Sequence, residues 1–302
     1  MPISNNFLPK SILVVVDPVH DNSPLFERAA WLAQQYEADL TLFSSDYDHL
    51  LLSSYLVDDF ILPSVMHAYE ESLSAHLDSA AKPLREKGLT VKTHSEWAAG
   101  SLEYSIKNYL TTHNADLILK QATHHPKLET LLFAPDDWML IRQAPKPLLY
   151  SYQTPIAGNV VAAIDVNPSN TDHNIAILQH ADQYAAQLNS PLTVLTCYKH
   201  SLLESISALT DLIQQHDQDT LCRRHRSAID ALIQQAQISP AQIEVLEGAP
   251  QHAITRYMQE SASQTLVVGA TEQHIIHHHT TEKLLEAVCC DLLVIPSLQE
   301  KE

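Results

Sequence analysis

Short runs of β-branched and other apolar residues recur along the chain, and segments with helical spacing separate them. The first run, Ile12–Val16, contains no polar residue and is followed by Asp17, which predicts a strand buried on both faces of a sheet. Next, Asn22–Pro24 combines a capping residue with proline in a first turn. We therefore expect a helix over Leu25–Tyr36, with Asn22 as its cap.

The rest of the first half continues this alternation. We expect strands at Ala38–Ser44, Thr90–Ala98, Asp116–Lys120 and Pro147–Tyr150, helices at Ser101–Leu110 and across most of Leu128–Arg142, and an irregular, partly helical segment at Leu50–Lys87. Strands that alternate with helices indicate a parallel sheet covered by helices on both faces.

The second half repeats the first in order and spacing. The matching features are Ile12–Asp17 with Val160–Asp165, Gly100 with Gly248, Leu119-Lys120 with Val268-Gly269, and Leu148–Tyr150 with Leu292–Val294. This indicates a tandem duplication. We expect a first domain over 1–153 and a second over 158–302, with a linker near Gln153–Asn159, where the composition is typical of a linker.

The stretch Ser263–Ser297 carries the main chemical question. It predicts a buried strand ending at Gly269, a loop, a helix and a last buried strand at Leu292–Ile295. A strand that leads through a loop into a helix is a place to hold phosphate. This loop, however, contains four histidines and two acids where a phosphate site would use glycines.

Composition narrows the classes of function. The 302 residues, 45% of them hydrophobic, suffice for two domain cores. A formal charge of −18 argues against nucleic acid and anionic membranes as partners. We expect no signal peptide and no membrane span, and four cysteines without a C-x-x-C pair fit a reducing cytoplasm. Five glycines in the whole chain exclude both G-x-G-x-x-G and the P-loop.

Specific motifs point to a family. The segment Asp116–Arg142 contains Leu-Lys, Lys-Leu-Glu, Phe-Ala-Pro-Asp-Asp-Trp and Leu-Ile-Arg in this order, and the second half ends in Cys290–Ile295. In these features the chain resembles the universal stress protein family, in its tandem two-domain type. The resemblance implies an α/β fold: two Rossmann-like, adenine-nucleotide α-hydrolase-like domains, each a mostly parallel five-stranded sheet flanked by helices. It also implies a cytoplasmic stress-response role, pairing of the two domains within the chain, and a homodimer.

The resemblance further implies ATP, ADP or AMP at the carboxyl ends of the strands, held by an acid after the first strand and by a loop G-x-x-G-x9-G-[ST]. In the second half, Asp165 matches the acid and Gly269, after Val268, matches the first glycine. Thr280 or Thr281 stands for the hydroxyl residue. Glu272 occupies the place of the second glycine, and the third is absent.

The first half departs further from this pattern. Asp17 matches the acid, but Lys120 stands where the first glycine belongs. From the residues alone, Asp17 and Asp165 either cap a loop or contact a ligand. Gly269 either approaches a phosphate or relieves a tight turn.

Three hypotheses about function stay open. The first is a ligand-binding or regulatory module without turnover, with any adenine nucleotide in the second domain. The second is a weak ATPase or nucleotide switch at the same place, although no G-x-S-x-G, H-E-x-x-H or paired-cysteine motif supports catalysis. The third is a zinc protein that uses His274, His277, His278 and His279, because imidazole is a good zinc ligand. Solvated loop histidines are the plain alternative to the third.

Overall fold

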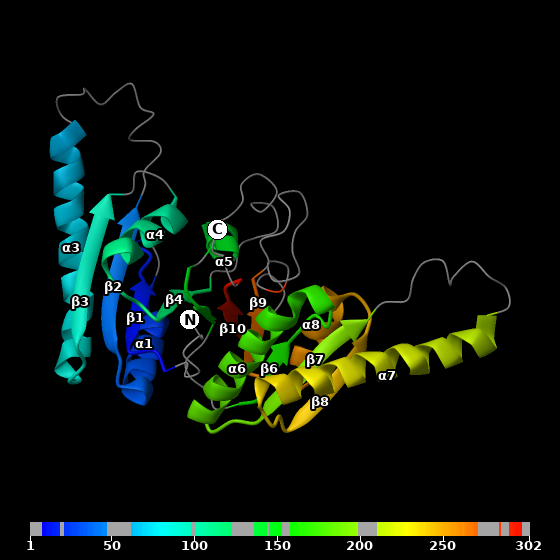
Figure 1. The fold of residues 1–302 in the computed structure, drawn as a ribbon. Coiled ribbons are helices and arrows are strands. Elements are labelled where there is room, and N and C mark those ends of the chain that lie inside the picture. The colour runs from blue at the N-terminus through cyan, green and yellow to red at the C-terminus, as the bar shows by residue number, and fades with distance from the viewer. Residues whose placement is uncertain are drawn as a thin grey trace. The chain divides into compact units, whose positions relative to one another are not determined.

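The computed structural model describes residues 8–18, 21–46, 62–97, 101–122, 136–143, 145–152, 158–198, 210–261, 263–270, 284 and 290–297. The chain divides into two compact units, Leu8–Pro155 and Ile156–Glu302 (Figure 1). We call them the first and the second unit and describe each by itself.

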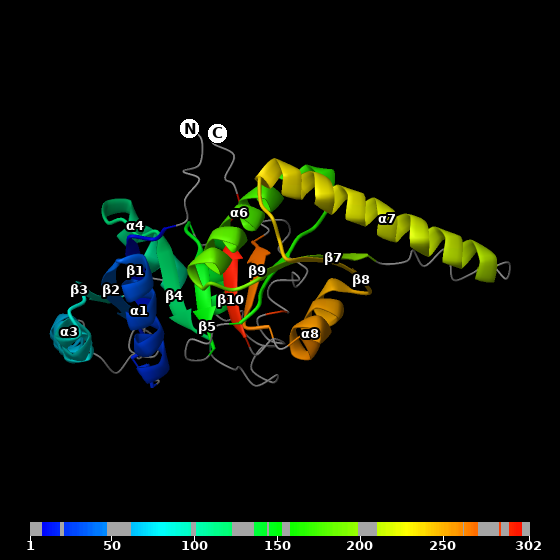
Figure 2. The same ribbon diagram turned by 90° about the horizontal axis from the view of Figure 1, so that it is seen from below.

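The first unit is a parallel sheet with helices on both faces (Figure 2). Its strands lie in the order β3-β2-β1-β4-β5, and each neighbouring pair is parallel. Their bounds are β1 Ser11–Val15, β2 Asp39–Asp46, β3 Val91–Trp97, β4 Leu117–Gln121 and β5 Leu148–Ser151. The helices are α1 Ser23–Tyr36, α3 Leu62–Glu86, α4 Leu102–Thr112 and α5 Asp136–Gln143.

The second unit repeats this arrangement, with the order β8-β7-β6-β9-β10 and parallel pairs throughout. Its strands are β6 Val160–Ala163, β7 Leu192–Tyr198, β8 Gln242–Glu247, β9 Thr265–Gly269 and β10 Asp291–Ile295. The helices are α6 Thr171–Gln187, α7 Thr210–Ala236 and α8 Pro250–Glu260, with a short 3-10 turn at Pro168–Asn170. In Figure 2, α6 and α7 lie on one face of this sheet and α8 on the other. The predicted fold class is confirmed.

The apolar runs form the centre of each sheet. Side chains of Ile12–Val14, Leu117–Leu119 and Leu148–Tyr150 in the first unit are completely buried, as are Val160–Ala162 and Leu292–Leu293 in the second. Strands buried on both faces explain why the sequence shows unbroken apolar runs instead of alternation.

Two local predictions are confirmed only in part. Residues 62–86, expected to belong to an irregular, partly helical segment, form the continuous helix α3, because Leu73, Leu77, Ala81 and Leu84 make a buried stripe at helical spacing. Asn22 stands at the N-cap position of α1, but its side chain makes no capping bond. Its amide instead accepts a hydrogen bond from the Asp17 N–H (3.2 Å) and donates one to the Asp17 carbonyl (2.7 Å).

A mostly buried ion pair anchors α5 in the first unit. Lys120 Nζ lies 2.8 Å from Asp137 Oδ1, and the two side chains are only 12% and 4% exposed. The Tyr150 hydroxyl also donates to the Asp137 carbonyl at 3.1 Å. The first turn of α5 is therefore tied to the ends of both β4 and β5.

Removing one charge of this pair should be costly. We expect Lys120→Met to lower the free energy of unfolding of the first unit by about 3 kcal/mol, because it removes the ammonium group that is paired with a buried carboxylate. The double variant Lys120→Met with Asp137→Leu should recover most of the loss. Urea unfolding followed by circular dichroism measures both.

The exposed pair Arg85–Asp78, with side chains 43% and 55% exposed, provides the control. Asp78→Asn should change the unfolding free energy by less than about 1 kcal/mol. A Lys120→Met variant as stable as this control would contradict the assignment of an anchoring role to the buried pair.

Candidate functional site

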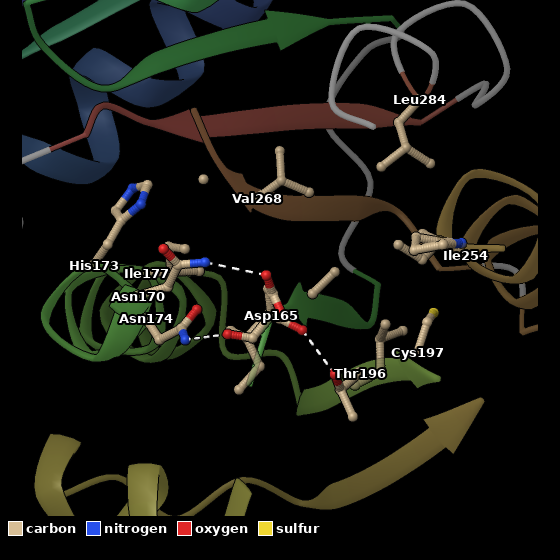
Figure 3. Close-up of a pocket in the computed structure, with 15 residues that line it drawn as sticks. Asp165, Asn170, His173, Asn174, Ile177, Thr196, Cys197, Ile254, Val268 and Leu284 are labelled. Carbon is tan, nitrogen blue, oxygen red and sulfur yellow. Dashed lines mark hydrogen bonds between the residues drawn. The ribbon is translucent and has the colours of Figure 1, made fainter. Parts of the chain in front are cut away.

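The second unit contains a pocket of about 310 Å³ where its strands end (Figure 3). Such a volume is at the lower end of the range for small-molecule sites. The lining residues come from the ends of β6, β7 and β9, from the start of α6 and from α8, with Leu284 in addition. They are Ala163, Ile164, Asp165, Asn170, His173, Asn174, Ile177, Leu195, Thr196, Cys197, Pro250, Ile254, Val268, Gly269 and Leu284. Three residues predicted from the sequence, Asp165, Val268 and Gly269, thus line one cavity.

Asp165 follows β6 and organises the connection to α6. Its exposed carboxylate accepts hydrogen bonds from the Asn167 N–H and from Asn170 Nδ2, both at 3.1 Å. Asn174 Nδ2 donates to the Asp165 backbone carbonyl (Figure 3). The capping role considered for Asp165 is therefore present, and the carboxylate also lines the pocket.

Gly269 is needed for the close approach of α6. A Cβ atom at this position would lie 2.6 Å from His173 Cε1 and 2.8 Å from Ile177 Cδ1. Gly88 and Gly248 are the described glycines with positive φ. Gly269 is therefore not explained by a left-handed backbone conformation. It is explained by the His173 and Ile177 side chains of α6, which occupy the space of a Cβ atom.

His173 connects α6 to the last strand. Its Nε2 lies 3.2 Å from the Ile295 carbonyl oxygen, and since a carbonyl only accepts, this nitrogen carries the proton. Burial lowers the pKa of His173, although hydrogen bonds to the carbonyls of Ile295 and Pro296 act in the opposite direction. Burial therefore favours the neutral form of the ring.

The end of β7 contributes Thr196 and Cys197. The Thr196 hydroxyl donates to the Ile164 carbonyl at 2.9 Å. Burial raises the pKa of the Cys197 thiol to about 11, so the sulfur stays protonated at neutral pH and is a poor nucleophile or metal ligand.

Sequence reasoning missed most of the polar lining, namely Asn170, His173, Asn174, Thr196 and Cys197. A signal for them existed. Asn170, His173 and Asn174 start the helix after β6, and Thr196 and Cys197 end the neighbouring strand. Because carboxyl ends of parallel strands meet at one edge, polar residues there belong to one site.

The first unit repeats part of this arrangement. Asp17 follows β1 as Asp165 follows β6, and the Ser44 hydroxyl donates to the Val16 carbonyl at 3.0 Å, as Thr196 does in the second unit. The predicted match of Lys120 with Gly269 is wrong by one residue. Ala122 N–H donates to the Ser151 carbonyl as Ala270 N–H donates to the Ile295 carbonyl, so Gln121 stands at the position of Gly269. Lys120, whose ammonium is paired with Asp137, corresponds to Val268. Asp17 therefore belongs to a different unit from the pocket.

Several predicted residues lie outside the described part of the chain. These are Thr280, Thr281, His274, His277, His278 and His279, together with Glu272. The zinc hypothesis stays a prediction; the described residues include no group of three or more histidine, cysteine or acidic side chains that could hold a metal.

No helix within the described ranges has the length and apolar character to cross a membrane.

Comparison with known proteins assigns the family. The model of the universal stress protein family matches residues 9–150 and, a second time, residues 157–296. The chain belongs to the universal stress protein family. Universal stress protein E of Salmonella typhi is 25% identical over 300 residues, covering 95% of this chain and 94% of that protein. The protein of the same name from Escherichia coli (strain K12) is 24% identical over 300 residues, covering 95% and 93%. The predicted tandem type is confirmed.

Solved structures of similar proteins agree on the fold. A protein of unknown function from Pseudomonas aeruginosa PAO1 is 24% identical, with a TM-score of 0.70 over 97% of this chain and 95% of that one. A putative universal stress protein from Pseudomonas aeruginosa UCBPP-PA14 is 25% identical, with a TM-score of 0.68 over 96% and 94%. Both span nearly the whole tandem chain.

Substituting Gly269 tests the packing of α6. We expect Gly269→Ala to destabilise the second unit by about 1–3 kcal/mol, because the new methyl group overlaps His173 and Ile177. Urea unfolding measures the loss. The double variant Gly269→Ala with His173→Ala should recover part of it, since the smaller side chain makes room. A single variant as stable as the wild type would contradict the close approach.

Proposed function

We propose that this universal stress protein acts by binding a ligand, without turnover, and that the second-unit pocket holds an adenine nucleoside or nucleotide. The proposal rests on one observation: Asp165 and Gly269, which are far apart in sequence, line the same cavity where β6 and β9 end. In open parallel sheets this edge is where nucleotides bind.

The lining matches the parts of a nucleoside. Ile177, Ile254, Val268 and Leu284 provide apolar surface for a flat base. The exposed carboxylate of Asp165 is an acceptor for the hydroxyl groups of a ribose. Charge-assisted hydrogen bonds of this kind are stronger than those between neutral groups.

A role in binding fits the chemistry of the pocket better than catalysis does. Cys197 is held as a thiol and His173 is engaged with a backbone carbonyl. Neither is in the state of an activated nucleophile. The first unit, where Lys120 and Asp137 pair at the corresponding edge, serves in this proposal as a structural partner. The cytoplasmic location and the homodimer stay predictions.

Isothermal titration calorimetry with adenosine and ADP tests the proposal on matched variants. Asp165→Asn keeps an oxygen that accepts a hydrogen bond and removes the charge. We expect it to weaken binding by about tenfold or more, because hydrogen bonds to a charged group contribute about 1.5–3 kcal/mol. Asp17→Asn makes the same change in the first unit and should alter affinity by less than about twofold.

Two results would contradict the proposal. One is wild-type protein that binds neither compound at about 1 mM, an affinity limit of about −4 kcal/mol. The other is an equal loss of affinity in Asp165→Asn and Asp17→Asn. Release of phosphate from ATP by the wild type, abolished in Asp165→Asn, would favour the ATPase alternative.

A further inference from the structure

The hydrogen-bond donors around the second-unit pocket are directed at the protein itself. Four lining side chains each aim a donor at a protein oxygen: Asn170 at Asp165 Oδ2, Asn174 at the Asp165 carbonyl, Thr196 at the Ile164 carbonyl and His173 at the Ile295 carbonyl. Figure 3 shows the first three of these bonds converging on the end of β6.

The backbone N–H group that follows β9 is also directed at a protein oxygen. The Ala270 N–H, the first after the glycine, donates to the Ile295 carbonyl at 2.8 Å. A phosphate site would turn such N–H groups toward the anion. The space beside Gly269 is occupied by the side chains of His173 and Ile177.

Acceptors and negative charge remain for a ligand. The Asp165 carboxylate is exposed at the pocket. The 15 described lining residues include no lysine or arginine. A phosphate group brings only acceptors and charge of the same sign as Asp165, whereas the hydroxyl groups of a ribose bring donors.

We propose that this pocket selects the uncharged nucleoside over its phosphate esters, with Asp165 as the residue that determines this specificity. The proposal rests on the proposed function and adds to it the class of ligand. Phosphate groups contribute no affinity at the described pocket, so the bound compound is recognised through its base and its hydroxyl groups.

The test compares adenosine, AMP and ATP by calorimetry at one pH and salt concentration. For the wild type we expect adenosine to bind at least as tightly as AMP or ATP. In Asp165→Asn, the affinity for AMP relative to adenosine should rise by about fivefold, because the like charge is gone while the shared nucleoside contacts cancel in the ratio. The first-unit variant Asp17→Asn should leave this ratio unchanged.

A second variant adds charge in place of removing it. His173→Lys places an ammonium group at the pocket wall and should raise the relative affinity for AMP by about tenfold. Thermal unfolding checks that each variant is folded, and Asp165→Asn decides the question even where His173→Lys does not fold.

The outcomes separate this proposal from the proposed function. Wild-type protein that binds ATP or AMP about tenfold more tightly than adenosine would overturn the selection and leave nucleotide binding intact. An unchanged ratio in Asp165→Asn would remove Asp165 from its role in specificity. Binding of none of the three compounds would refute the proposed function, and this inference with it.

Discussion

Two side chains of helix α6, His173 and Ile177, lie so close to the end of β9 that a Cβ atom at position 269 would overlap them. The rest of the site depends on this contact. With α6 in this position, His173 reaches the Ile295 carbonyl, and Asn170 and Asn174 reach the carboxylate and the backbone of Asp165. One helix thus joins the ends of β6 and β10, and the cavity lies between these contacts. Because interiors are densely packed, a methyl group at Gly269 would displace His173 and Ile177.

The two units have the same strand order but differ where the strands end. In the second unit the glycine leaves room for a helix and a cavity. In the first, Gln121 occupies the corresponding position, and Lys120 before it forms an ion pair with Asp137. A buried pair of this kind resists the loss of either partner. The duplication therefore kept the fold in both halves, with a ligand role proposed for the second alone.

The sequence predicted the central strands and the parallel sheets well, because the apolar runs from Ile12 and from Val160 are unbroken and repeated at matching places. It also indicated Asp165 and Gly269, which directly follow or end such runs. His173 and Cys197 were not singled out although both lie where strands end, because the chain alone does not show which polar residues at that edge line a cavity. The sequence predicted helix within Leu50–Lys87 but not its extent, because polar residues separate the members of the buried stripe of α3.

The physical reason for Gly269 could not be read from the chain at all. Glycine before a loop has several uses, and only the position of the His173 and Ile177 side chains distinguishes them. Likewise, the sequence shows Asn22 at a helix start, but not that its amide binds both backbone groups of Asp17. Such choices between competing hydrogen bonds are made by tertiary structure.

Native mass spectrometry of the untagged protein, as purified and after addition of adenosine, tests the central claim most directly. The account predicts one adenine compound per chain, released on denaturation and identified by its mass. A chain that stays free of ligand at about 1 mM adenosine, ADP or ATP would contradict it. Zinc bound to a chain that takes up no adenine compound would also contradict it, and would favour a zinc protein that uses His274, His277, His278 and His279.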